Sequence, residues 1–351
     1  MKTGVHTERT SVPVNMCWRK VPTKHISLPR FTVNIDKIIK KYERVYIFGD
    51  LHDNENIFKT YLLRNDIAFI LPGTECDMLN ITNMYVKPSI LLIFLGDVIY
   101  KTKGHFKSIF RFILNNRSNC LLFLGNNEVK FVYKNIHMFL PIAKQCVPRR
   151  RYETLRRAME SKQAGNKIVS SIYSIMDWFH SSRDNNLKKA WKWYYECLQV
   201  EYHLDRVSCE DLMILMYILT ESAVIGFSNR LKLILLHAGC NPNRALKDQL
   251  IVDVCNIRID RKTKTPWFWH YSDLRYVFLF GHWSELTVCG KTAQPFYFNN
   301  VICLDTGCCY TNVLTCVSFC MKSITANDQL HFIQNMSRSN DNTFYDIVIS
   351  S

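Results

Sequence analysis

Cysteine pairs spaced as Cys-x-x-Cys are absent from this sequence, although it contains 14 cysteines in 351 residues. A structural zinc ribbon is therefore not supported by the cysteine pattern. Long apolar runs are also absent, since the longest, Ile90 to Tyr100, is too short to span a bilayer and contains Asp97. Residues 1–15 lack the apolar core of a signal peptide. These absences predict a protein without a transmembrane segment, kept in the reducing interior of the cell, either the cytoplasm or the nucleus.

Acidic residues are scarce relative to basic ones. The chain has 30 Asp and Glu against 45 Lys and Arg, which gives a formal net charge of +15. A positive field of this size favours polyanionic partners such as nucleotides, RNA or acidic membrane surfaces, although it can also serve solubility alone. Apolar residues make up 48% of the chain, enough to fill the core of one large domain or two small ones.

Short apolar runs of strand length recur along the chain. Each is rich in β-branched or aromatic residues, as expected of central strands buried on both faces. A helical pattern, Phe106–Asn115, lies between two of them, so the sequence predicts an α/β fold of layered sheets flanked by helices. Val301–Leu304 and Val313–Phe319 are predicted to form a further, antiparallel pair. The five principal runs are Val45–Phe48, Ile90–Leu95, Leu121–Leu124, Leu231–Leu236 and Tyr276–Phe280.

The chain divides by composition into three consecutive regions, and the second of them contains an insertion. Residues 1–43 are basic and interrupted by prolines, and are predicted to form an arm or irregular lead-in. Residues 44–325 contain the apolar runs and form the predicted domain. A helical, basic insertion is expected at about 130–230, and residues 326–351 are expected to be a C-terminal tail without recognisable chemistry.

The insertion is basic and aromatic. Residues 149–193 contain eleven Lys or Arg and four Asp or Glu, together with Trp178, Trp191 and Trp193. Arginines contact phosphates and tryptophans stack on bases, so this region is a candidate RNA-binding surface. The alternative is an ordinary helical cap whose aromatic residues lie in the core. Ser208 and Asp211 are expected to form a capping box at the start of one helix.

A residue able to bind a metal follows each of the five principal runs. In Gly49-Asp50-Leu51-His52, alternation along an extended segment predicts that Asp50 and His52 point to the same side. Ligands at the carboxyl ends of buried strands converge at one edge of a sheet. The other motifs are Gly96-Asp97, Gly125-Asn126, His237-Ala238-Gly239 and Gly281-His282-Trp283.

This ligand set suits a particular chemistry. Carboxylate, imidazole and amide oxygen together favour divalent ions of intermediate hardness, such as Mn²⁺, Fe²⁺ or Zn²⁺. Two such ions a few ångströms apart can activate a shared water and clamp both oxygens of an in-line phosphoryl displacement. A lone Gly-Asp or strand-end histidine is more often structural, but five in a fixed order predict a metal-dependent phosphoesterase.

The motifs GDLH, GD, GNNE, HAG and GHW, in this order, resemble those of the calcineurin-like metallophosphoesterase superfamily, which includes the Ser/Thr protein phosphatases. Within it, FGHWSEL, GKT and LDTGCCY in residues 280–316 resemble the ApaH-like symmetrical bis(5′-nucleosyl)-tetraphosphatases. The resemblance covers residues 44–129 and 230–318. It implies the metallophosphoesterase fold and two bound divalent metals, with Mn²⁺ preferred and Fe²⁺, Zn²⁺ or Mg²⁺ as alternatives.

The resemblance also implies a role for each motif residue. Asp97 is the bridging ligand and, with Asn127, is assigned to catalysis. Arg258 matches an arginine that holds substrate phosphate, and Lys101 stands where the family usually has a second one; lysine keeps the charge but loses the planar fork. The implied ligands are Asp50, His52 and Asp97 for one metal, and Asp97, Asn126, His237 and His282 for the other.

The chain departs from the family pattern at Asn127, where a histidine is expected. That histidine protonates the leaving group or steadies the attacking oxygen, and an amide cannot donate a proton at neutral pH. Losing a general acid typically costs about 10²–10⁴-fold in rate. His105 and His137 are the nearby substitutes, each more typical of a surface residue. The spacing from Val129 to Arg230 also differs, so the region that covers the substrate is not inherited.

These observations favour hydrolysis of the phosphoanhydrides of dinucleoside polyphosphates or RNA 5′ caps. A polyphosphate leaves more readily than a serine alkoxide and so depends less on the missing acid. A Ser/Thr protein phosphatase is the first alternative, supported by the shared motifs and opposed by Asn127. A catalytically weakened domain that binds capped or phosphorylated ligands is the second, although an inactive site would not need all six ligands.

Overall fold

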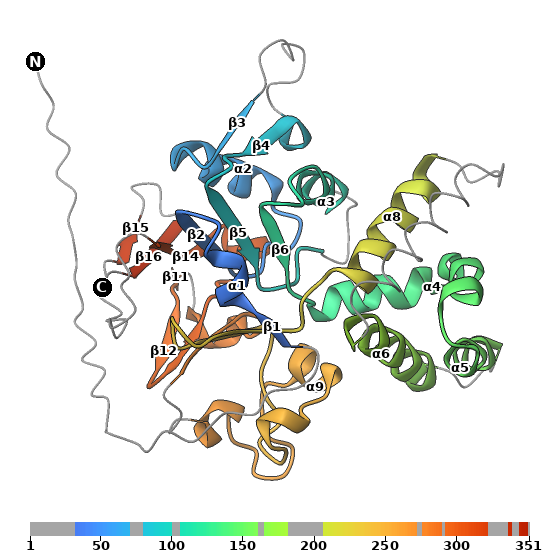
Figure 1. The fold of residues 1–351 in the computed structure, drawn as a ribbon. Helices are drawn as coiled ribbons and strands as arrows, with labels where there is room; N and C mark the ends of the chain where they lie inside the picture. The colour runs from blue at the N-terminus through green and yellow to red at the C-terminus, as the bar shows by residue number, and fades with distance from the viewer. Residues whose placement is uncertain are drawn as a thin grey trace, which may run out of the picture.

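The computed structural model describes residues 32–70, 80–99, 106–160, 165–181, 206–271, 276–289, 292–321, 336–338 and 344–349. Within these ranges the chain forms two six-stranded sheets, two small two-stranded sheets and helices around them (Figure 1). The predicted α/β class with layered sheets is therefore confirmed. Every helix in the described ranges is too short or too polar to cross a bilayer.

The first large sheet carries the N-terminal half of the motifs. Its strand order is β15-β16-β14-β2-β5-β6, and β2, β5 and β6 are parallel neighbours. The strand β14 pairs antiparallel with β2 and parallel with β16. The bounds are β2 Arg44–Phe48, β5 Ile90–Phe94, β6 Cys120–Leu122, β14 Leu314–Cys320, β15 Met336–Arg338 and β16 Phe344–Ile349.

The second large sheet carries the C-terminal motifs. Its order is β1-β7-β8-β9-β13-β12, and β8, β9 and β13 are parallel neighbours. Each large sheet therefore contains three adjacent parallel strands whose carboxyl ends lie along one edge. The bounds are β1 Thr32–Asn34, β7 Ile225–Ser228, β8 Leu233–Leu236, β9 Val277–Phe280, β12 Phe296–Phe298 and β13 Val301–Cys303.

The two large sheets pack face to face around an apolar core. Val45 and Ile47 of β2 belong to the same buried cluster as Leu233 and Leu235 of β8. The intervening side chains of β2 point the other way, where Phe48 packs edge-on against Phe58 of a covering helix at 5.3 Å between ring centroids. The strands are thus buried on both faces, which is why they read as continuous apolar runs rather than alternating ones.

The predicted helical insertion is confirmed. It lies between β6 and β7, to one side of the sheets in Figure 1. The first and last helices pack on each other, and α5 packs on α6. The expected capping box at Ser208 is wrong, because α8 already begins at Arg206 and Ser208 lies within its first turn. The four helices are α4 Asn126–Cys146, α5 Arg149–Glu160, α6 Gly165–Ser181 and α8 Arg206–Thr220.

The remaining elements cover the sheets or connect them. The predicted helix Phe106–Asn115 is present as α3, and it buries Ile109, Phe110, Phe112 and Ile113 at helical spacing. The others are α1 Ile35–Ile39, α2 Glu55–Arg64, β3 Ala68–Ile70, η2 Ile81–Asn83, β4 Met84–Val86, η3 Leu246–Asp248, α9 Ile251–Asn256, η4 Trp267–His270, η5 Ser284–Leu286, β10 Val288–Cys289, β11 Thr292–Ala293 and α10 Cys308–Thr311.

Two expectations about the ends of the sheets are corrected. The strands β13 and β14 do not pair, because the segment containing α10 carries the chain from the second sheet to the first. Part of the expected tail, residues 336–338 and 344–349, forms β15 and β16 at the edge of the first sheet. Residues 32–39 of the expected lead-in likewise form β1, paired with β7, and α1.

Candidate metal centre

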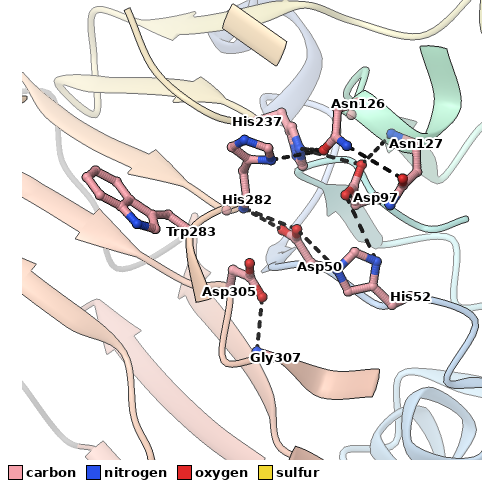
Figure 2. A network of polar contacts seen from close by, with 12 residues as sticks. Asp50, His52, Asp97, Asn126, Asn127, His237, His282, Trp283, Asp305 and Gly307 are labelled. Carbon is pink, nitrogen blue, oxygen red and sulfur yellow. Dashed lines mark hydrogen bonds and ion pairs between the residues drawn. The ribbon is translucent and has the colours of Figure 1, made fainter. Parts of the chain in front are cut away.

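The predicted ligands meet at the edge where the parallel strands of both sheets end (Figure 2). The first sheet contributes Asp50 and His52 after β2, Asp97 after β5, and Asn126 at the start of α4 beyond β6. The second sheet contributes His237 after β8, His282 after β9 and Asp305 after β13. Carboxylate, imidazole and amide side chains that follow six strands thus surround one small volume.

Four of these residues form what we call the histidine cluster: Asp97, Asn126, His237 and His282. The Oδ1 atom of Asn126 lies 2.9 Å from His282 Nδ1 and 3.1 Å from His237 Nε2. Asp97 Oδ1 lies 3.5 Å from His237 Nε2. Ligand atoms of Asp97, His237 and His282 are all within 4.8 Å of one another, so one cation can contact all three.

Three residues form a second, carboxylate cluster: Asp50, His52 and Asp305. Their ligand atoms also lie within 4.8 Å of one another. His52 Nε2 is 3.7 Å from Asp50 Oδ2, and His52 Nδ1 is 4.0 Å from Asp97 Oδ2. Asp97 therefore faces His52 with one oxygen and His237 with the other. A carboxylate in this position can be a ligand of two ions at once.

The two histidines of the histidine cluster are held with a lone pair toward its centre. His237 Nδ1 lies 2.8 Å from the carbonyl oxygen of Leu95, and His282 Nε2 lies 3.3 Å from that of Asn256. A carbonyl only accepts, so each of these nitrogens carries the proton and the opposite nitrogen has the lone pair. Burial lowers the pKa of His237 well below its usual value and that of His282 to about 3. Both rings are therefore neutral, as metal ligands must be.

The carboxyl groups lie in surroundings that oppose their ionisation. Burial, and then the neighbouring carboxylates Asp305 and Asp97, raise the pKa of Asp50 well above its usual value. Burial, and then Glu128, raise the pKa of Asp97. Burial also raises the pKa of Asp305 to about 6. A bound divalent cation reverses this balance, because its charge favours the ionised carboxylates.

The Asn126 amide provides a test of whether these residues fit a cation. In the orientation drawn, its oxygen faces only other acceptors. Lone pairs gathered in this way repel one another unless a cation lies among them. Turning the amide over would instead let its nitrogen donate to His282 Nδ1 at 2.9 Å and to Asp97 Oδ2 at 3.0 Å. Whichever way the amide is turned, the carboxylate and imidazole ligand atoms within each of the two clusters lie within 4.8 Å of one another, a donor set that suits divalent metals.

Glycines in the motifs allow the loops to approach closely. A Cβ on Gly281 would overlap Asp50 Oδ1, and one on Gly125 would overlap the backbone nitrogen and Oδ1 of Asp97. Buried Glu128 then joins two of the loops, because Oε2 accepts from Asp97 N at 2.8 Å and from Gly125 N at 2.9 Å. The E of the GNNE motif therefore has a structural role that the motif pattern alone did not indicate.

The argument that placed Asp50 and His52 on one side is corrected. The strand β2 ends at Phe48, and His52 has a φ of 48°, so the segment is a turn and not an extended chain. Asp97 and His282 also have positive φ, at 48° and 66°. Such conformations are uncommon outside glycine and concentrate at functional sites. The two side chains still converge, but through a turn that brings His52 back toward Asp50.

Asn127 contacts Asp97 and is buried. Its backbone N–H donates to Asp97 Oδ1 at 2.9 Å, and its Nδ2 donates to Asp97 Oδ2 at 2.8 Å. Both oxygens of the shared carboxylate are thereby oriented by one residue. The suggested substitutes for the family histidine do not stand here, since His137 is exposed on α4 and His105 lies outside the described residues.

Of the two residues predicted to bind substrate phosphate, the structure describes only Arg258. Arg258 lies beside the centre, where it donates to the carbonyl oxygen of His282 at 2.7 Å and to Glu285 Oε1 at 2.8 Å. Its Nε is buried and has no hydrogen-bond partner among the described residues. Lys101 lies outside the described residues.

Asp305 belongs to the LDTGCCY motif, but the motif pattern gave it no role in the centre. It follows β13 just as Asp97 follows β5, so the strand-end rule used for the other motifs would have found it. Its Oδ1 accepts from Gly307 N at 3.0 Å, which directs the carboxylate toward Asp50 (Figure 2).

No family model and no curated protein matches the chain. Among solved structures it is similar to a candidate diadenosine tetraphosphatase, with a TM-score of 0.42 and 15% identity over 84% of this chain and 94% of that one. At this TM-score the similarity does not decide the function.

Two further solved structures are similar at lower scores. A protein Ser/Thr phosphatase from Saccharomyces cerevisiae has a TM-score of 0.35 and 10% identity over 79% of this chain and 71% of that one. A mutant of a cold-active protein tyrosine phosphatase has a TM-score of 0.35 and 11% identity over 80% and 74%.

Proposed function

We propose that this protein is a metal-dependent phosphoesterase that hydrolyses phosphoanhydride bonds in dinucleoside polyphosphates or RNA 5′ caps. The observation that carries the proposal is the pair of adjoining ligand clusters with Asp97 between them. Two divalent cations bound there would supply an activated water and Lewis-acid polarisation of a phosphoryl oxygen. The ligands would be Asp50, His52, Asp97 and Asp305 for one cation, and Asp97, Asn126, His237 and His282 for the other, with Mn²⁺ as the first choice.

The protein residues around the clusters support this chemistry. Asn127 fixes both oxygens of Asp97, so the shared carboxylate has a single orientation. Arg258 offers a guanidinium beside the centre, and a guanidinium binds phosphate in a bidentate manner. The Glu285 carboxylate that it contacts is largely exposed, and exposed ion pairs contribute about 0–1 kcal/mol, so an incoming phosphate can replace it.

The choice of an anhydride rests on Asn127. With an amide in place of the family histidine, the site suits a leaving group that needs no proton, and a nucleoside polyphosphate is such a group. A Ser/Thr protein phosphatase has an alkoxide leaving group and is the second candidate. A weakened domain that only binds capped or phosphorylated ligands is the third. Nine of the cysteines in the described ranges are free thiols, which supports the proposed intracellular location.

A side-by-side substrate test separates the three candidates. Protein loaded with Mn²⁺ is incubated with diadenosine tetraphosphate, capped RNA and a phosphoserine peptide, and the products are quantified by chromatography. We expect hydrolysis of one or both anhydrides to exceed that of the peptide, and chelation to stop it. Peptide hydrolysis as the fastest reaction would favour the protein phosphatase, and binding without turnover would favour the weakened domain.

Binding of RNA by the insertion is proposed separately, from the exposed arginines of α5. Arg149 and Arg150 are exposed, whereas Arg151 donates to Ser174 Oγ of α6 at 2.6 Å and so has a structural role. Trp178 is partly buried, packs on the core and lies 4.8 Å from Phe179 between centroids, so it supports the alternative of a helical cap. Trp191 and Trp193 lie outside the described residues.

If α5 holds RNA, replacing Arg149 and Arg150 with Gln should weaken binding and flatten its salt dependence. For single strands the log–log slope changes by about 0.7 for each phosphate that the protein no longer neutralises. Fluorescence anisotropy at several salt concentrations measures both effects, with Lys40→Gln/Lys41→Gln, an exposed pair beyond α1, as the control. Unchanged affinity in the arginine variant would leave the insertion as a structural cap.

A further inference from the structure

Lys130 is a cation beside the metal centre that lies outside the sequence motifs. It lies one helical turn beyond Asn127 on α4, is exposed, and its Nζ donates to Asn127 Oδ1 at 3.0 Å. The same Nζ lies 2.7 Å from one amide atom of Asn126, whose other amide atom faces His282 Nδ1 at 2.9 Å. A single side chain therefore separates the ammonium from the histidine cluster.

The orientation of the Asn126 amide determines what Lys130 meets. When the amide oxygen points toward the histidines, as a metal requires, the amide nitrogen is the atom that faces the ammonium. In either orientation of the amide, one of its two heavy atoms lies 2.7 Å from Lys130 Nζ, so the ammonium borders the histidine cluster. An oxygen of a phosphate placed at the centre is an acceptor of the right charge.

The charge of Lys130 also acts on the cluster itself. A positive charge this close repels a bound cation, but it also lowers the pKa of Asp97, against the burial that raises it, and so favours the ionised ligand; metal binding alone therefore does not decide the role of Lys130. A substrate phosphate bound over the metals would be stabilised by the Lys130 ammonium, and this gives the lysine a role.

We propose that Lys130 contacts a phosphate oxygen of the substrate. Its ammonium would supply the positive charge that is missing because Asn127 stands where the family has a histidine. The inference rests on the proposed function. The position is three residues after Asn127, so the ammonium lies over the amide that replaces the family histidine. A lysine there holds negative charge on the phosphate without transferring a proton, which suits a polyphosphate leaving group. Arg258, which already contacts Glu285, would bind the phosphate from the other side.

The test replaces Lys130 with Gln, with Lys130→Arg as the conservative variant and Lys134→Gln, an exposed lysine one turn farther along α4, as the matched control. For Lys130→Gln we expect kcat/KM on diadenosine tetraphosphate to fall by roughly 10–100-fold, the usual effect of losing a hydrogen bond to a charged group. Lys130→Arg should keep most of the activity because it keeps the charge. Lys134→Gln should match the parent protein.

Two binding measurements by calorimetry distinguish this role from a structural one. Affinity of the Mn²⁺-loaded protein for inorganic phosphate should fall in Lys130→Gln, while affinity for Mn²⁺ alone should stay equal or rise, because a repelling charge is gone. Weaker Mn²⁺ binding, or unchanged kcat/KM and phosphate affinity, would overturn the proposal. If the parent protein hydrolyses no substrate, the proposed function fails, and the phosphate affinities of the two proteins still decide the role of Lys130.

Discussion

Replacing Asp97 with Asn should abolish metal-dependent hydrolysis and weaken Mn²⁺ binding more than any other single change at the centre. Among the described residues, Asp97 alone faces both clusters, at 4.0 Å from His52 Nδ1 and 3.5 Å from His237 Nε2. Its charge offsets that of two cations at once. Loss of an outer-shell partner typically costs about 10–100-fold in metal affinity, and loss of the shared ligand should exceed that range.

The amide would also be mispaired in this variant. Both oxygens of Asp97 accept N–H groups of Asn127, so an Asn at this position must direct its own N–H₂ at one of those donors. Metal affinity by calorimetry and turnover at saturating Mn²⁺ measure the two effects. Asp66→Asn, at an exposed position paired with Lys87, is the matched control and should change neither. Retention of parent-like Mn²⁺ affinity by Asp97→Asn would disprove the shared-ligand role.

The strands and the site edge could be predicted because both depend on local sequence. The runs ending at Phe48, Phe94 and Phe280 are apolar on both faces, and a buried strand must be followed by a turn. Polar residues directly after such strands can only lie at the sheet edge. The same logic applies to Asp305 after β13, so the signal for this carboxylate was present in the sequence as well.

What could not be predicted depends on contacts between distant segments. Nothing local to Phe344–Ile349 indicates that it pairs with β14, because a short, mostly apolar strand suits several partners. The turn that brings His52 back toward Asp50 requires a positive φ that no neighbouring glycine announces. The hydrogen bonds of Arg258 to Glu285 and to the His282 carbonyl likewise arise only when η5 and the loop before η4 meet.

In the metal-free protein, the stability contributed by the buried carboxyl groups should be lost as pH rises from about 4 through their folded-state pKa values, which is about 6 for Asp305. The carboxyl groups of Asp50, Asp97 and Asp305 have raised pKa values, to about 6 for Asp305. A carboxyl group whose pKa is raised in the folded state contributes to the free energy of unfolding. That contribution is fully present below the unfolded pKa of about 4 and is lost as pH rises through the folded pKa. The histidines have lowered pKa values, so their contribution is lost only as pH falls below about 6.5. Between about pH 4 and 6.5 the contributions of the carboxyl groups and of the histidines to stability therefore change in opposite directions as pH rises.

Mn²⁺ should reverse this trend, because the ions require ionised carboxylates. At about 100 times the dissociation constant a ligand adds about 2.7 kcal/mol of stability. For a chain of 351 residues that corresponds to a Tm increase of about 3–4 °C. The Tm difference between Mn²⁺ and chelator, measured by scanning calorimetry from pH 5 to 8, should therefore widen with pH.

Asp305→Asn provides the sharper version of this measurement. The Asn side chain can still accept from Gly307 N, so the local hydrogen bond survives while the ionisable group with a pKa of about 6 is removed. In this variant the Tm difference between Mn²⁺ and chelator should increase less between pH 5 and 7 than in the parent protein. In Asp66→Asn the increase should match that of the parent protein. Because the imidazoles of the histidine cluster are already neutral over this range, they release no proton when metal binds. A Tm difference that is constant with pH in the parent protein would show that no buried carboxyl group binds the metal.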